Sequence, residues 1–174
     1  MVEYGDTEQG CYVEKGMSGY GVAVQLHRDT PMEEAWIKAM AEEMMPEIAR
    51  KCESRGAKYI GHIKSHVRTE AGTVKADTLG HAEGAYSAGK IEHPVGTLYM
   101  AINSILYGLK EAEVKEATLE GIHEVADRHG LQVDKEKEHA YFDEFDYLQD
   151  DEAYTETLKE QFEAEGDPKD ADRI

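Results

Sequence analysis

Two histidines, a lysine and an arginine occupy alternate positions in the stretch GHIKSHVR, residues 61–68. They are His62, Lys64, His66 and Arg68. Imidazole, ammonium and guanidinium groups donate charge-assisted hydrogen bonds to carboxylates and phosphates. On a helix, two histidines four residues apart would also share one face and could bind one metal ion. The stretch therefore raises two hypotheses, an anion site and a metal site.

The residues between these cations favour a strand. Tyr59, Ile63 and Val67 alternate with them, a pattern typical of a strand with one buried face. Positions four apart on a strand are separated by about 13 Å, whereas a Zn–N bond is about 2 Å long. The two histidines would then need further ligands to hold a divalent metal. The candidate metal ligands are His62, His66, Asp77, His81 and His93.

A half-buried sheet turns its apolar residues toward covering helices and collects polar side chains on the opposite face. We expect that polar face to carry the candidate ligand-binding residues, which are His27, His62, Lys64, His66, Arg68, Tyr99, Asn103 and Tyr107. Such a face would suit an anionic small molecule or an acidic segment of a partner. Any half-solvated sheet shows the same alternation, and a second copy or the chain's own acidic segment could cover it. The residues alone leave these interpretations open.

A catalytic interpretation competes with the binding interpretation. Imidazole titrates near neutral pH, so His62 or His66 could act as a general acid or base under a loop at residues 80–96. Gly84–Lys90 matches the start of a P-loop, but Ile91 replaces the Ser/Thr that binds Mg²⁺. We therefore expect a non-enzymatic binding or accessory protein of unknown cofactor. A small enzyme and a structural homo-oligomer subunit are the alternatives.

The charge balance narrows the partners. The chain has 174 residues with 19 Lys/Arg and 37 Asp/Glu, a net charge of -18. This acidity disfavours nucleic acid, because affinity for a phosphate backbone requires a basic surface. No stretch approaches the roughly 20 apolar residues of a membrane-spanning helix, and the N-terminus lacks a secretory signal pattern. We expect a cytoplasmic homo-oligomer that does not enter a membrane.

Composition divides the chain into three parts. Residues 141–174 hold 13 Asp/Glu against 3 Lys/Arg. We therefore expect an acidic, partly helical tail over 140–174, whose aromatic residues pack on the parent domain, on another copy or on a partner; we favour the first two. The glycine-rich residues 1–19 indicate a flexible arm. Residues 20–139 are long enough for one α+β domain.

Hydrophobic periodicity within that domain predicts five strands and two helices. The expected strands are 20–28, 58–69, 73–79, 97–109 and 131–139, and the expected helices are 31–55 and 111–129. A capping box at residues 30–33 would start the first helix. Residues 97–109 also fit a helical face, but their β-branched residues favour a strand. The order predicts a ferredoxin-like α+β sandwich, with an antiparallel sheet, an added strand and both helices on one face.

The run IGHIK at residues 60–64, with LYGL at residues 106–109 and the following helix, resembles the small C-terminal domain that follows the GTPase in CobW-type metallochaperones. The resemblance covers about residues 58–130. The GTPase with its P-loop and the cysteine motif that binds metal in those proteins have no counterpart in this sequence. The resemblance implies an accessory domain in metal or cofactor handling, and it transfers no functional residue.

Overall fold

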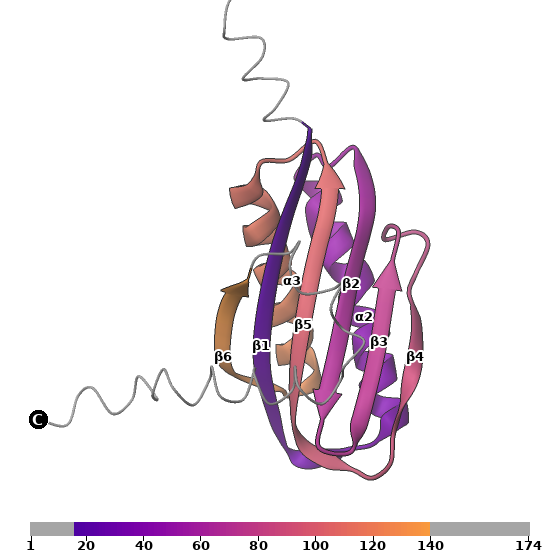
Figure 1. The fold of residues 1–174 in the computed structure, drawn as a ribbon. Helices are drawn as coiled ribbons and strands as arrows, with labels where there is room; N and C mark the ends of the chain where they lie inside the picture. The colour runs from indigo at the N-terminus through magenta and orange to yellow at the C-terminus, as the bar shows by residue number, and fades with distance from the viewer. Residues whose placement is uncertain (1–15, 140–174) are drawn as a thin grey trace, which may run out of the picture. The chain divides into compact units, whose positions relative to one another are not determined.

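Six strands and two helices follow one another along residues 16–139, the part of the chain that the computed structural model describes (Figure 1). In chain order they are β1 (Met17–Met32), α2 (Glu34–Ser54), β2 (Tyr59–Thr69), β3 (Gly72–Thr78), β4 (Tyr86–Ile91), β5 (Val95–Tyr107), α3 (Glu111–His129) and β6 (Gln132–His139). The predicted acidic tail and most of the predicted N-terminal arm lie outside the described residues.

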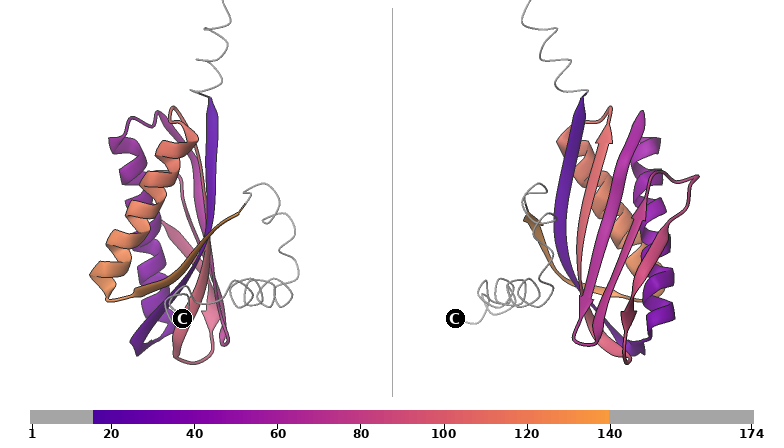
Figure 2. Two further views of the ribbon diagram at one scale, coloured as in Figure 1. Left: turned by 90° about the vertical axis from the view of Figure 1, so that its left-hand side faces the viewer. Right: turned by 45° about the vertical axis from the view of Figure 1, so that its right-hand side comes forward.

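The strands form one sheet in the order β4-β3-β2-β5-β1-β6, and every neighbouring pair is antiparallel. Both helices pack on the same face of this sheet (Figure 2). The α+β class, the antiparallel sheet and the position of the two helices are therefore confirmed. Within residues 16–139, neither helix combines the length and apolar content needed to cross a bilayer.

The core lies between the sheet and the two helices. From α2 it receives the predicted apolar stripe, in which Ile37, Met40, Met44, Met45, Ile48 and Cys52 are all 0% exposed. Alternate residues of the central strands meet this stripe, among them Val22, Val24, Leu98 and Met100. Each fully buried side chain of this size contributes about 1.5–3 kcal/mol to folding. Burial on this side fixes which residues of each strand point away from the helices.

The first helix starts later than the capping box predicts. Strand β1 continues to Met32, which pairs with Val95 beyond an irregularity in the ladder and is 0% exposed. The helix begins at Glu34, and Glu33 makes no side-chain cap. An N-cap contributes about 0.5–2 kcal/mol, less than or similar to the burial of a methionine. The predicted arm was also too long, because β1 already starts at Met17.

The predicted loop at residues 80–96 contains a strand, β4, paired with β3. Only Ile91 of its six residues is buried, so no apolar alternation signals this strand in the sequence. Gly89 has a φ of 133°, and a Cβ there would clash with the Thr73 carbonyl oxygen. The sheet thus has two strands beyond β2, and the expectation of a single added strand was wrong. Residues 97–109 do form a strand as favoured, within β5.

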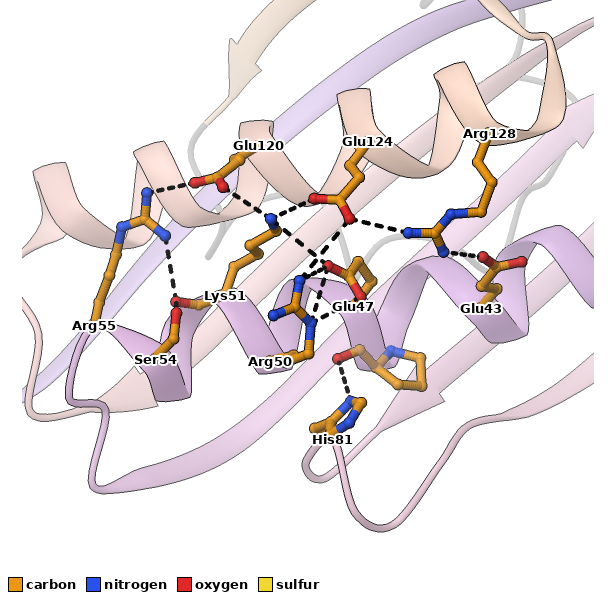
Figure 3. Close-up of polar contacts among 11 residues, drawn as sticks. Glu43, Glu47, Arg50, Lys51, Ser54, Arg55, His81, Glu120, Glu124 and Arg128 are labelled. Carbon is orange, nitrogen blue, oxygen red and sulfur yellow. Dashed lines mark hydrogen bonds and ion pairs between the residues drawn. The ribbon is translucent and has the colours of Figure 1, made fainter.

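Ion pairs join α2 to α3 along the side away from the sheet (Figure 3). Lys51 Nζ lies 2.8 Å from Glu120 Oε1 and also pairs with Glu124, and Arg55 Nη2 lies 2.6 Å from Glu120 Oε2. Arg128 of α3 pairs with Glu43 of α2. The hydrogen bonds from Lys51 and Arg55 lower the pKa of Glu120 to about 2. Cations between the helices are therefore matched by carboxylates of the helices themselves.

Close packing between the helices depends on Gly121 of α3. A Cβ at this position would lie 2.7 Å from Ile48 Cγ1 and 3.0 Å from Ile48 Cα. We predict that Gly121→Val lowers the free energy of unfolding by about 1–3 kcal/mol, because the helices must move apart. Urea denaturation measures this loss. Gly96→Val is the control, since a Cβ there meets only the Arg28 carbonyl oxygen at 3.9 Å. Equal losses in the two variants would contradict the close contact.

Candidate functional site

The face of the sheet opposite the helices is called the outer face below, and Figure 1 views the sheet from that side. Side chains alternate along a strand, so the neighbours of the core residues point to this face. Antiparallel register aligns three rows of outer-face positions, which run from β4 to β6. The rows therefore show which polar residues lie beside one another.

The rows carry far more cations than carboxylates. Their Lys and Arg residues are Lys64, Arg68, Lys75, Lys90, Lys135 and Lys137. His66 lies between Lys64 and Arg68 on β2, and Asp77 is the single carboxylate within the described rows. A basic surface thus crosses the sheet of a chain whose net charge is -18.

The centre of this surface is a buried polar floor. Arg68 is 0% exposed and His66 is 1% exposed. Arg68 Nη2 lies 3.1 Å from His66 Nδ1 and donates to it, which leaves the proton of the neutral ring on Nε2. Lys64 and Lys75 lie beside this pair in the register and are exposed. The exposed lysines are therefore the groups that a ligand can reach first.

Asn103 adds an acceptor to the floor. It is 3% exposed, and its Oδ1 has no hydrogen-bond partner among residues 16–139. In the register it lies between Lys64 of β2 and Gly21 of β1. A buried amide oxygen without a donor costs about 1–3 kcal/mol. This position suits a ligand that brings an N–H or O–H donor.

His62 lies at the next outer-face position of β2, opposite Ile105. Burial of the ring lowers the pKa of His62 below its ordinary value, and the Lys64 ammonium lowers it further. Asp77 acts in the opposite direction on the same pKa. The neutral ring is therefore favoured near neutral pH, and it can both donate and accept a hydrogen bond.

The remaining candidates lie toward the two ends of the outer face. His27 Nδ1 is 2.7 Å from Asp134 Oδ1, and Tyr99 lies beside Arg68. At the other end Tyr107 packs on Tyr59, with ring centroids 5.8 Å apart. The prediction that Tyr59 shares the buried side of Ile63 and Val67 was wrong, because a bulge between Ile60 and His62 turns it outward, where it is 62% exposed.

All eight predicted ligand-binding residues therefore lie on one face, although they do not surround one point. Tyr99 and Tyr107 alone are separated by eight strand positions, or about 26 Å. The sequence-based set omitted Lys90, Lys135 and Lys137. Alternating lysines in DKEKEH, residues 134–139, were the available signal, but only the register shows that they share the face of Lys64.

The five candidate metal ligands are not brought together. His62 and His66 flank Lys64 on β2, and Asp77 lies across from that lysine. His81 and His93 lie in the turns before and after β4, where His81 Nδ1 is 3.3 Å from the Pro46 carbonyl oxygen (Figure 3). Residues 16–139 contain no group of three His, Cys, Asp or Glu that could hold a metal ion.

The catalytic alternative needs a loop over His62 or His66, and residues 80–96 do not provide one there. Their strand β4 pairs with β3 and is separated by it from β2. Nδ1 of His66 already accepts a hydrogen bond from Arg68. The expected lid was therefore wrong for this segment.

Comparison with known proteins gives little further information. No protein-family model and no curated protein matches the chain. A similar solved structure is a Zn(II)-bound triple mutant of the YjiA GTPase, with 13% sequence identity and a TM-score of 0.27. The match covers 59% of this chain and 29% of the GTPase chain. YjiA is a CobW-family protein, so the expected resemblance is met only in this weak form, which establishes neither a common fold nor a function.

The electrostatic setting of His62 can be tested by histidine NMR titration. We predict that Lys64→Ala raises the pKa of His62, because a neighbouring positive charge is removed, and that Asp77→Asn lowers it. The Lys38→Ala variant changes a lysine on α2 instead and should leave this pKa unchanged. Opposite shifts, or equal shifts in all three variants, would contradict the described arrangement.

The same lowered pKa predicts the pH dependence of stability. In the unfolded chain His62 has its ordinary pKa of about 6.5, and in the native state this pKa is lower. At a pH between these two pKa values the unfolded chain therefore binds more protons than the native state. The contribution of His62 to the free energy of unfolding is therefore complete above about pH 6.5. It is lost as the pH falls from there through the lower, native-state pKa. Urea denaturation should show a weaker fall in stability over this range for His62→Gln than for the wild type.

Proposed function

We propose that the protein is a non-enzymatic binding or accessory protein whose outer face binds anionic groups. The observation that carries the proposal is the set of exposed lysines Lys64, Lys75 and Lys90, which lie in rows whose single carboxylate among the described residues is Asp77. Metal or cofactor handling is one role that such an anion-binding protein would have. A cytoplasmic location and homo-oligomerisation stay predictions.

The contrast between the two sides of the sheet supports the proposal. Cations between the helices pair with helix carboxylates, as Lys51 and Arg55 do with Glu120. Lys64 and Lys75 form no ion pair within residues 16–139. An ammonium group 4 Å from an anion gains about 1–4 kcal/mol, depending on how far water is excluded. An incoming anion can therefore form new ion pairs with these lysines of the outer face, whereas the cations between the helices are already paired.

The proposal includes the fold family. Leaving aside β3 and β4, the elements run β1-α2-β2-β5-α3-β6, which is the β-α-β-β-α-β order of a ferredoxin-like sandwich. The hairpin of β3 and β4 then widens the sheet next to β2. In this interpretation the widening supplies Lys75 and Lys90 to the outer face.

The test is a double variant, His62→Ala with Lys64→Ala, in the full-length protein. Pyrophosphate, citrate, poly-glutamate and a single-stranded oligonucleotide serve as probes, with binding measured by calorimetry. We expect at least one probe to bind the wild type and to bind the variant about tenfold or more weakly, because two ligand donors are lost. The melting temperature should fall only modestly, because Lys64 is exposed and His62 is half-buried.

A matched control removes one histidine and one lysine from α3. His123→Ala with Lys115→Ala breaks pairs with Glu136 and Glu138 and makes the same change in charge. Binding to this control should equal binding to the wild type. The proposal fails if no probe binds the wild type, or if both double variants lose affinity equally.

A further inference from the structure

Strand β4 is one edge of the sheet, and β3 is its one neighbour among the strands of residues 16–139 (Figure 1). Successive residues of a strand turn their N–H and C=O groups to opposite sides. The N–H of Glu92, just after β4, donates to the Ala71 carbonyl oxygen and so faces the β3 side. The N–H of Ile91 donates instead to Glu34 Oε2 of α2 at 2.9 Å, and so faces the open side. Every second residue of β4, counted back from Ile91, therefore turns its backbone groups to the open edge.

Ser87 and Gly89 are the other residues of β4 in this set. Within residues 16–139 their backbone groups make no hydrogen bond on the open side. Gly89 is exposed and Ser87 is half-buried, so another chain can reach both. Natural sheets commonly cover such an edge with a helix or loop, because unpaired backbone groups are a template for another strand. Here Glu34 of α2 closes only the end at Ile91, so the edge stays open at Ser87 and Gly89.

The sequence of β4, YSAGKI, is complementary to itself in one antiparallel register. When two copies of β4 share a twofold axis at Ala88, Ser87 of each copy lies opposite Gly89 of the other. Opposite residues whose backbone groups face each other exchange both N–H···O bonds, so the open groups of both copies become paired. Tyr86 then lies opposite Lys90, and an ammonium group near a tyrosine ring is attracted to it. This register favours a second copy of the chain over an unrelated strand.

The side chains beside the open edge leave room for this pairing. On the helix side Gly89 has no side chain, and Ser87 Oγ is held toward α2 because it donates to Glu42 Oε1 at 2.5 Å. On the outer face Tyr86 is 73% exposed and Lys90 is exposed. Lysine on an edge strand commonly prevents pairing. In this register, however, the two lysines are separated by four strand positions, or about 13 Å, so they do not oppose each other.

From these observations we propose that β4 is the interface between two copies of the chain, which pair antiparallel about a twofold axis at Ala88. The two sheets then join into one continuous sheet. Because both copies use the same strand, the contact closes at the dimer. A strand of six residues buries less area than a standard protein interface, so the dimer is weak and depends on concentration. The inference is independent of the proposed anion binding and gives the predicted homo-oligomer a specific interface.

The first test removes one backbone donor from the open edge. Sedimentation equilibrium of the full-length protein, from about 10 μM to about 1 mM, measures the dimer dissociation constant. Ser87→Pro deletes an N–H that faces the open side and leaves the ladder to β3 complete. We expect dimerisation to weaken about tenfold or more. Ser87→Ala is the matched control, because it loses the hydroxyl bond to Glu42 but keeps the N–H, and it should dimerise as the wild type does.

The second test checks the register through exposed side chains, which can change without unfolding the strand. Tyr86→Lys places lysine opposite Lys90 of the second copy at two symmetric positions. We expect this repulsion to weaken the dimer about tenfold or more. Adding Lys90→Tyr to the same chain restores a tyrosine opposite a lysine in reversed order. The dissociation constant of this double variant should return to within about threefold of the wild-type value.

Three results would overturn the inference. They are a monomer at every concentration, a dimer that Ser87→Pro leaves as stable as Ser87→Ala does, and a failure of the reversed pair to restore dimerisation. The melting temperatures of Ser87→Pro and Ser87→Ala, measured in dilute solution, should agree and so exclude a folding defect as the cause of a lost dimer. The calorimetric test of anion binding changes residues of β2 instead, so either proposal can fail while the other stands.

Discussion

Burial of one sheet face against α2 and α3 is the constraint on which the other features depend. Because side chains alternate along a strand, a slip of one residue would exchange the whole set of core residues for the outer set. Val22, Met100 and Ile63 are 0% exposed, so such a slip would place apolar residues in water and charged residues in the core. The apolar core thereby determines which face of the sheet every one of these cations occupies.

The two helices and the centre of the sheet were predictable because each carries a strong apolar period, as Met40, Met44 and Ile48 do on α2. Strand β4 was not, because an edge strand can be held by backbone hydrogen bonds with only Ile91 buried. The start of α2 was also misplaced. A local capping signal at residues 30–33 competed with the burial of Met32, and burial depends on a partner strand distant in sequence.

The candidate site shows the same limit. Alternation within β2 was enough to place His62, Lys64, His66 and Arg68 on one face. Sequence spacing gave no means of placing Lys75 and Lys137 in one row with His66, since that requires the register of four strand pairs. Asn103 was named from its position on β5, but only the folded structure shows that its Oδ1 has no hydrogen-bond partner among the described residues.

The bulge between Ile60 and His62 divides the outer face into two zones. After the bulge, from His62 onward, the alternation of β2 produces the basic rows. Before the bulge the alternation is reversed, so that Tyr59 points to the outer face and packs on Tyr107. One extra residue in a strand thus allows a charged zone and an aromatic zone to coexist on a single face. Substitutions at one end of the outer face can therefore change its surface chemistry while the core stays the same.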